Sequence, residues 1–486
     1  MKRGELVFVP SPGIGQLVPA VEVAKLLVQR DHRLSATIFI ITLPFDNKIT
    51  TYADSLASSS SSIDGRVKFI TLPEQKPSLE GNFLTSLIEI QKPHVKKVAA
   101  QFAHSESGPE EPRLAAFVIG MFCTTMIDVA NEFGVPTYVF YTSSAGALGL
   151  MLHLQTLRDV HSQDITELKD SDTELMVPSC INPVPAKVLP SVVLNRDWSM
   201  VILDQFQRFK ETKGILVNTF LELEGHAVKS FANSEIPSVY PVGPILDLKG
   251  DAHVGSSDDR QGEDLICWLD DQPPASVVFL CFGSMGSFSE DQVREIACAL
   301  EQCGYRFVWS LRRPLPKGKM GYPGDYTNPE AALPEGFLER MATVGRVIGW
   351  APQVAVLAHP AVGGFVSHCG WNSILESLWY GVPVATWPLY SEQQFNAFEM
   401  VRELGLSVEI RMDYRRDVRA ESESMVCADE IERGLKSLME SGNEMEMEMR
   451  KKVKEMKAKC RMVTMEGGSS YFYLGQLISE ILDGMQ

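Results

Sequence analysis

The stretch from Trp350 to Gln394 concentrates side chains that suit a phosphorylated ligand. Its run HCGWNSILES places Gly370, Asn372 and Ser373 at a predicted strand-to-helix junction. The unpaired backbone N–H groups and the dipole at such a junction favour an anion, and a diphosphate fits there. His368 comes directly before the turn and can donate a hydrogen bond to a phosphate oxygen.

Two further side chains near this junction suit the rest of a nucleotide. Glu376, one helical turn further on, can accept hydrogen bonds from ribose hydroxyls, as the acidic residue of a dinucleotide-binding fold does. Trp350 offers a flat face for a base, and such stacking contributes roughly 1 to 3 kcal/mol. Taken singly, Ser373 also fits a helix cap, His368 a core histidine and Trp350 a core aromatic. Their combination favours a nucleotide site.

The elements that must position these residues follow from the hydrophobic pattern. Short apolar runs such as ELVFVP, ATIFIIT and AAFVIG alternate with amphipathic stretches such as VPAVEVAKLLVQR. This alternation predicts βαβ units and a parallel sheet. A polar segment at 249–264 interrupts the pattern, which restarts at SVVFLCFGS. We therefore predict an α/β protein with two facing, Rossmann-like, doubly wound domains and a ligand cleft at the carboxyl ends of both sheets.

Composition excludes several classes of partner. The 486 residues carry a formal net charge of −17, which argues against nucleic acid or an anionic membrane surface as a partner. No run of 18 apolar residues and no signal peptide is found, so we expect no membrane insertion. Nine cysteines without a CxxC pair indicate reduced thiols. The expectation is a cytoplasmic monomer.

The 350–394 stretch closely resembles the signature box of the plant family 1 UDP-glycosyltransferases. W-A-P-Q, H-C-G-W-N-S, E-S, G-V-P, W-P and E-Q stand at the family's spacing, and PSPGIG, FYTSSAGALGLMLHLQ, VGPILDL, FGSMGSF and GGSSYFYL extend the resemblance. It implies a GT-B fold: an acceptor-binding domain at 1–248, a linker at 249–264, a UDP-sugar domain at 265–466 and a C-terminal helix at 467–486 that packs back on the first domain. The branch it resembles acts on small phenolic secondary metabolites, with flavonoid-like or phenylpropanoid-like acceptors.

The resemblance also implies a role for each donor-site residue. From base to sugar these are Trp350 and the Ala351 backbone for uracil; Gln353 and Glu376 for ribose; Ser284, His368, Gly370, Asn372 and Ser373 for the diphosphate; and Trp371, Glu392 and Gln393 for the sugar hydroxyls. Gln393 is the residue that the family associates with glucose, so UDP-glucose is the implied donor. We expect no metal and no other cofactor, because the helix N-terminus and His368 supply the positive potential. The D-x-D at 170–172 lies far from this box.

The catalytic positions depart from the family. There, a histidine in the first β–α turn deprotonates the acceptor and an aspartate after a later strand orients it. Here the two positions hold Gln16 and Gly120. Losing a general base costs about 10² to 10⁴ in rate, but a more acidic phenol depends less on a base. Gln16 can still hold an acceptor hydroxyl through its amide oxygen.

Several interpretations of these substitutions remain open. His94, His153 and Asp128 are candidate replacement bases, although each also fits an ordinary structural role. One hypothesis is an inverting UDP-glucose-dependent glucosyltransferase for small phenols that relies on positioning and acceptor ionisation. The alternative is a catalytically silent UDP-sugar-binding protein, natural or engineered. The residues expected around the acceptor are Gly15, Phe122, Ser143, His153 and Tyr390.

Overall fold

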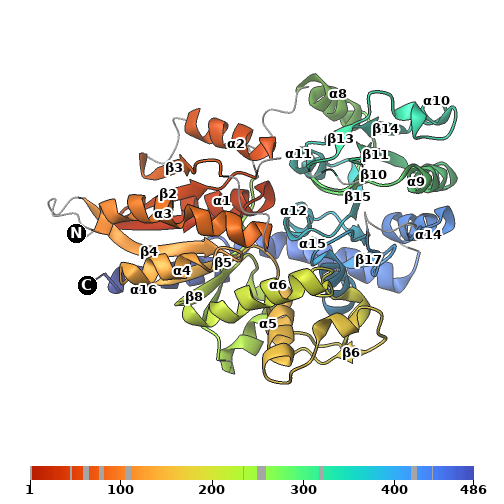
Figure 1. Cartoon of the computed structure of the whole chain (residues 1–486). Coiled ribbons are helices and arrows are strands. Elements are labelled where there is room, and N and C mark those ends of the chain that lie inside the picture. The colour runs from red at the N-terminus through yellow and green to blue at the C-terminus, as the bar shows by residue number, and fades with distance from the viewer. Residues whose placement is uncertain are drawn as a thin grey trace.

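The computed structural model describes residues 3–43, 46–58, 65–75, 82–103, 111–233, 235–248, 259–316, 319, 321–416, 424–440 and 442–485. Within them, two parallel sheets form two α/β domains that lie side by side (Figure 1). The prediction of two Rossmann-like domains is confirmed.

The N-terminal sheet has seven parallel strands among the described residues, in the order β3-β2-β1-β4-β5-β8-β9. The five central strands are buried almost without a break, as expected for strands covered by helices on both faces, whereas the edge strands β3 and β9 are partly exposed. The strands are β1 (Arg3–Val9), β2 (Leu34–Ile40), β3 (Val67–Thr71), β4 (Pro112–Gly120), β5 (Thr137–Tyr141), β8 (Gly214–Val217) and β9 (Ser238–Pro241). The helices are α1 (Ile14–Arg30), α2 (Asn47–Ser58), α3 (Phe83–Ala103), α4 (Met126–Glu132), α5 (Ala145–Asp159), α6 (Arg196–Arg208) and α7 (Leu221–Ser230).

The C-terminal sheet has six parallel strands in the described part of the chain, in the order β14-β11-β10-β15-β16-β17. The strands are β10 (Val277–Cys281), β11 (Arg306–Ser310), β14 (Gly345–Ile348), β15 (Val362–Ser367), β16 (Val384–Thr386) and β17 (Ser407–Glu409). The helices are α8 (Asp259–Asp270), α9 (Glu290–Cys303), α10 (Phe337–Met341), α11 (Gln353–Ala358), α12 (Trp371–Tyr380), α13 (Gln393–Phe398), α14 (Ala428–Met439) and α15 (Glu444–Met462). Two short hairpins complete the fold: β6 (Glu174–Leu175) with β7 (Val184–Pro185), and β12 (Arg312–Arg313) with β13 (Gly324–Asp325).

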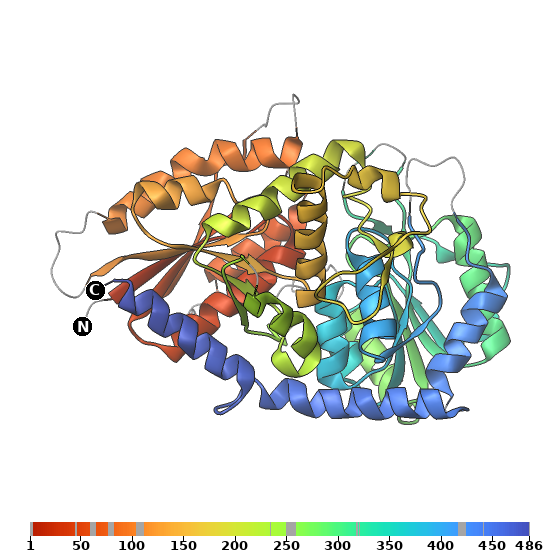
Figure 2. The same ribbon diagram turned by 90° about the horizontal axis from the view of Figure 1, so that it is seen from below.

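Helix α8 begins at Asp259, within the linker expected at 249–264, and positions 249–258 lie outside the described residues. At the other end of the chain, α15 runs along the C-terminal domain and α16 (Ser469–Asp483) lies on the N-terminal one (Figure 2). Leu477 and Ile481 of α16 are buried in the same apolar cluster as β1 and α1.

The two domains share a buried interface. One apolar cluster joins residues of the N-terminal sheet, such as Phe117, to Ile374 of α12 and Phe395 of α13. Polar groups are buried there too. Glu224 of α7 accepts hydrogen bonds from the N–H groups of Ala145 (3.1 Å) and Gly146 (2.7 Å) at the start of α5.

Glu399, in a π-helical turn (Glu399–Glu403) that follows α13, faces this carboxyl group from the other domain. It is 3% exposed. Burial and the neighbouring Glu224 carboxyl raise the pKa of Glu399 well above its usual range. A carboxyl whose pKa is raised by folding stabilises the protein fully below its unfolded pKa, and that contribution is lost as the pH rises through the folded pKa.

Replacing Glu399 by glutamine should remove this pH dependence, because the amide keeps a donor toward Glu224 but cannot ionise. We expect the Tm of the natural chain to fall relative to that of the Glu399→Gln variant as the pH rises from about 5 to 9. Scanning calorimetry across this range measures the difference. Glu448→Gln, on an exposed surface pair with Lys451, is the matched control. Parallel Tm curves for Glu399→Gln and the natural chain would contradict the assignment.

Candidate active site

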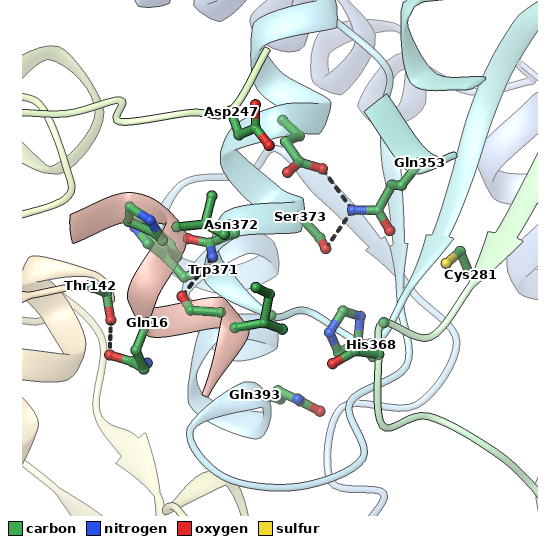
Figure 3. Close-up of a pocket in the computed structure, with 18 of the residues that line it drawn as sticks. Gln16, Thr142, Asp247, Cys281, Gln353, His368, Trp371, Asn372, Ser373 and Gln393 are labelled. Carbon is green, nitrogen blue, oxygen red and sulfur yellow. Dashed lines mark hydrogen bonds between the residues drawn. The ribbon is translucent and has the colours of Figure 1, made fainter. Parts of the chain in front are cut away.

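A cleft of about 320 Å³ lies between the domains, at the carboxyl ends of the strands of both sheets (Figure 3). This is where doubly wound folds place their ligands. All twelve predicted donor-site residues line the cleft, together with Gly15, Gln16 and Tyr390. The twelve are Ser284, Trp350, Ala351, Gln353, His368, Gly370, Trp371, Asn372, Ser373, Glu376, Glu392 and Gln393.

The N-terminus of α12 opens into this cleft. Strand β15 ends at Ser367, and Gly370 caps the helix without any side-chain hydrogen bond. Ile374 makes the first helical bond, from its N–H to the Gly370 carbonyl (3.0 Å). The N–H groups of the first turn, including that of Ser373, therefore have no partner within the helix. Together with the helix dipole they form an anion site.

His368 lies against this helix start and is 6% exposed. Two glycines make room for its ring: a Cβ atom at Gly283 would lie 2.4 Å from Nε2, and one at Gly370 would lie 2.6 Å from it. Burial lowers the pKa of His368 to about 4, so the imidazole is neutral at physiological pH. Its Nδ1 has no hydrogen-bond partner among the described residues. An unsatisfied ring nitrogen beside a helix N-terminus is suited to a phosphate oxygen.

The pair expected to hold ribose is linked by hydrogen bonds. The Nε2 group of Gln353 donates to Glu376 Oε2 (2.7 Å) and to Ser373 Oγ (2.8 Å) (Figure 3). Burial raises the pKa of Glu376 to about 7. The amide thus ties the first turn of α12 to the carboxyl group one turn further along.

The residues expected to reach the sugar are oriented differently from one another. The Oε1 atom of Gln393 accepts from the N–H groups of Leu389 (2.9 Å) and Tyr390 (3.0 Å), and its side chain is also hydrogen-bonded to the Tyr390 side chain. The indole N–H of Trp371 donates to the Asn218 carbonyl of the N-terminal domain (2.7 Å). This hydrogen bond makes the indole part of the domain interface, and Trp371 also lines the cleft.

Trp350, on which we expect a base to stack, is in contact with a lysine ammonium group. The Nζ atom of Lys48 lies 3.3 Å from the centroid of the Trp350 ring. Burial, with the nearby Arg312 guanidinium, lowers the pKa of Lys48 to about 7. Lys48 belongs to α2 of the N-terminal domain and lines the cleft.

Gln16 lies opposite the donor side and is bonded to Thr142, the residue that follows β5. The Thr142 hydroxyl donates to Gln16 Oε1 (2.6 Å; Figure 3). We expect the amide oxygen to hold the acceptor hydroxyl, and in the structure this oxygen already accepts one hydrogen bond from Thr142. The amide NH₂ is the other group that Gln16 can offer to a ligand.

Gly120, the other predicted catalytic position, lies behind Gln16 at a small enclosed cavity and not at the main cleft. A Cβ atom at Gly120 would lie 2.3 Å from the backbone nitrogen of Ser11 and 2.4 Å from its Oγ. The Ser11 hydroxyl in turn accepts from the N–H of Phe122 (3.1 Å). The turn at Ser11 therefore takes the space that a side chain at position 120 needs.

The remaining acceptor and base candidates lie in different places. Ser143 approaches the cleft through its hydroxyl, which donates to Glu392 Oε1 (3.4 Å). Phe122 and His94 are not among the residues that line the cleft. His153 lines a separate cavity of about 300 Å³, and Asp128 is ion-paired with Arg208 (2.6 Å) on the surface. The candidate replacement bases are therefore not brought together with Gln16.

Sequence reasoning missed several residues of the cleft. Thr142 and Asp247 follow β5 and β9, and the rule that sites form at the carboxyl ends of strands would have found them. Lys48 carries no such signal, because it comes from a helix of the other domain. In the described part of the chain, no group of three or more His, Cys, Asp or Glu side chains could hold a metal ion. None of the described helices is long and apolar enough to cross a membrane.

Comparisons with known proteins agree with this architecture. Residues 194–427 match the family model for UDP-glucoronosyl and UDP-glucosyl transferase. A putative UDP-glucose flavonoid 3-O-glucosyltransferase 3 of Fragaria ananassa is 56% identical over 99% of this chain and 100% of that protein. A UGT transferase from Siraitia grosvenorii, solved with UDP, is 50% identical, with a TM-score of 0.86 over 99% of this chain and 100% of that one. UGT71G1 of Medicago truncatula, solved with UDP-glucose, is 41% identical, with a TM-score of 0.85 over 99% and 98%.

Proposed function

Because the chain belongs to the plant family 1 UDP-glycosyltransferases, we propose that it transfers glucose from UDP-glucose to the hydroxyl group of a small, readily ionised phenol. The observation that carries this proposal is the hydrogen bond from Thr142 to Gln16 Oε1, which leaves the Gln16 amide NH₂ for the acceptor. An N–H donor stabilises a phenolate oxygen, whereas it cannot take a proton from a phenol.

The donor is held mainly by the C-terminal domain. The first-turn N–H groups of α12 and His368 bind the diphosphate, while Gln353 and Glu376 bind ribose. The base stacks on the Trp350 ring. The Gln393 amide group and the Glu392 carboxyl group bind the sugar hydroxyls. The presence of all twelve predicted donor residues in the lining of one cleft supports this assignment.

The acceptor enters from the N-terminal domain, beside Gly15 and Gln16. Its phenolate oxygen attacks the anomeric carbon from the face opposite UDP. The new carbon–oxygen bond forms as the bond to the β-phosphate oxygen breaks, so the configuration inverts and UDP leaves as an anion at the α12 N-terminus. The phenolic proton has already gone to solvent. A flavonoid hydroxyl fits this scheme, and a relative from Fragaria ananassa carries flavonoid 3-O-glucosyltransferase in its name.

We further propose that the protein works in the cytosol as a monomer. All nine cysteines are free, which suits a reducing compartment. Size-exclusion chromatography with light scattering measures the oligomeric state.

The test is turnover by the purified chain with UDP-glucose and a panel of phenols, followed by mass spectrometry. We expect phenol glucosides, with turnover reduced about tenfold in a His368→Ala variant, since that change removes one phosphate hydrogen bond. An Asp172→Ala variant, in the exposed D-x-D, is the matched control and should be unaffected. If UDP-glucose binds in calorimetry but is not consumed with any phenol, even at pH 9 to 10, the proposal is wrong. The protein would then be a catalytically silent UDP-sugar-binding protein.

A further inference from the structure

A cation from one domain occupies the aromatic ring that the proposed function assigns to the base of the nucleotide in the other. Lys48 Nζ lies 3.3 Å from the Trp350 centroid and 4.7 Å from that of Tyr322. This Nζ atom is buried and has no hydrogen-bond partner among the described residues. A second cation, Arg312, has its Cζ 5.0 Å from the same ring, but Arg312 does not line the cleft.

The position of Lys48 is held by a contact between the domains. Asp46 Oδ1 accepts from the N–H of Ile49 (3.1 Å) and so caps the start of α2. Its other oxygen, Oδ2, accepts from the Tyr322 hydroxyl of the C-terminal domain (2.7 Å). Asp46 therefore ties the beginning of α2, and with it Lys48, to the segment beside Trp350.

An ammonium group in contact with the Trp350 ring and a base stacked on that ring would occupy the same space. Lys48 and Trp350 both line the cleft, and the ammonium lies in contact with the ring, where a base would stack. The attraction between an ammonium and an indole face is significant when the pair is desolvated, as it is here. The base can stack only in those molecules in which Lys48 has moved off the ring. The apparent affinity for the nucleotide is therefore lower than the intrinsic affinity, in proportion to the fraction of molecules in that state.

We propose that Lys48 is a gate on the nucleobase subsite: its ammonium covers Trp350 until a stacked base displaces it, and the bond between Asp46 and Tyr322 holds the gate shut. The gate acts on ligands that contain an aromatic base and not on the diphosphate alone. This inference rests on the proposed function, which assigns the base to Trp350.

Calorimetry of the full chain with UDP tests the gate. We expect Lys48→Ala to bind UDP about threefold to tenfold more tightly than the natural chain, because the competing cation is gone. The affinity of Lys48→Ala for inorganic pyrophosphate should not increase, because the loss of a positive charge cannot favour the binding of an anion. Lys96→Ala, which removes an exposed lysine paired with Glu132, is the matched control and should leave the UDP affinity unchanged.

Two further variants test whether the positive charge at position 48 and the bond between Asp46 and Tyr322 both weaken UDP binding. Lys48→Arg keeps a cation that stacks well on aromatic faces, so it should bind UDP no more tightly than the natural chain. Tyr322→Phe removes the bond to Asp46 and should tighten UDP binding in the same direction as Lys48→Ala.

Equal or weaker UDP binding by Lys48→Ala would overturn the gate. The same holds if Lys48→Arg tightens binding as much as Lys48→Ala does. Trp350→Ala distinguishes this failure from that of the proposed function: if it binds UDP as tightly as the natural chain, the base does not stack on Trp350, and the donor assignment itself is wrong.

Discussion

Replacing Gln16 by histidine should raise the kcat for a phenol of pKa about 10 at least about tenfold at pH 7, because positioned proton transfer typically contributes about 10² to 10⁴. The Thr142 hydroxyl, which donates to Gln16 Oε1 (2.6 Å), can also accept from a ring N–H. It would orient the imidazole and leave the other ring nitrogen as the base. Initial rates at saturating UDP-glucose measure the gain.

Gln16→Leu is the matched control, since it fills a similar volume without a base or a donor. The Gln16→His variant should also acquire an inflection in its pH–rate profile near the imidazole pKa of about 6.5, which the leucine variant lacks. An unchanged kcat in Gln16→His, with UDP affinity intact, would mean that the acceptor oxygen does not lie beside position 16.

Adding Gly120→Asp to Gln16→His should not complete the dyad. The new Cβ would lie 2.3 Å from the Ser11 backbone nitrogen, so the turn at Ser11 must move. We therefore expect the double variant to have a lower Tm than Gln16→His and a similar kcat. A much higher kcat with an unchanged Tm would show that the turn at Ser11 can move at little cost.

The rate of the natural chain should rise about tenfold for each pH unit below the pKa of the acceptor and level off above it. This follows because Gln16 provides a donor and no base, so that only the ionised fraction of the phenol reacts. A phenol of pKa about 10 is roughly 0.1% ionised at pH 7, whereas one of pKa about 7 is about half ionised. More acidic acceptors should accordingly be preferred at neutral pH.

The measurement is log kcat/KM against pH for two or three phenols of different acidity. The midpoint of each profile should move with the pKa of the phenol, which separates acceptor ionisation from titration of the protein. An aliphatic alcohol, which does not ionise in this range, is the control and should give no measurable product. Profiles that share one midpoint for all phenols would point to a protein base and contradict the role of Gln16.

The sequence was most informative where the chemistry is local. The anion site consists of one strand, one turn and the first turn of one helix, all within the 350–394 stretch. Strand and helix periodicity and turn chemistry depend on neighbouring residues, so the helix N-terminus at Gly370 could be predicted from the residues themselves. The roles expected of Gln353, Glu392 and Gln393 followed only from the resemblance to the family. The alternation of strands and helices likewise predicted the two parallel sheets.

The other half was decided by tertiary structure. Gln16 and Thr142 are 126 positions apart, and their hydrogen bond determines which end of the amide serves the cleft. The fit of Ser11 against Gly120 and the placement of Lys48 on Trp350 likewise join segments far apart in the chain. No local pattern encodes such contacts, because they depend on how separate strands align in the sheet and how one domain docks on the other. The amino-acid sequence thus predicted the side chains that line the donor half of the cleft, whereas the packing of segments far apart in the chain decided how Gln16 and Lys48 are placed in it.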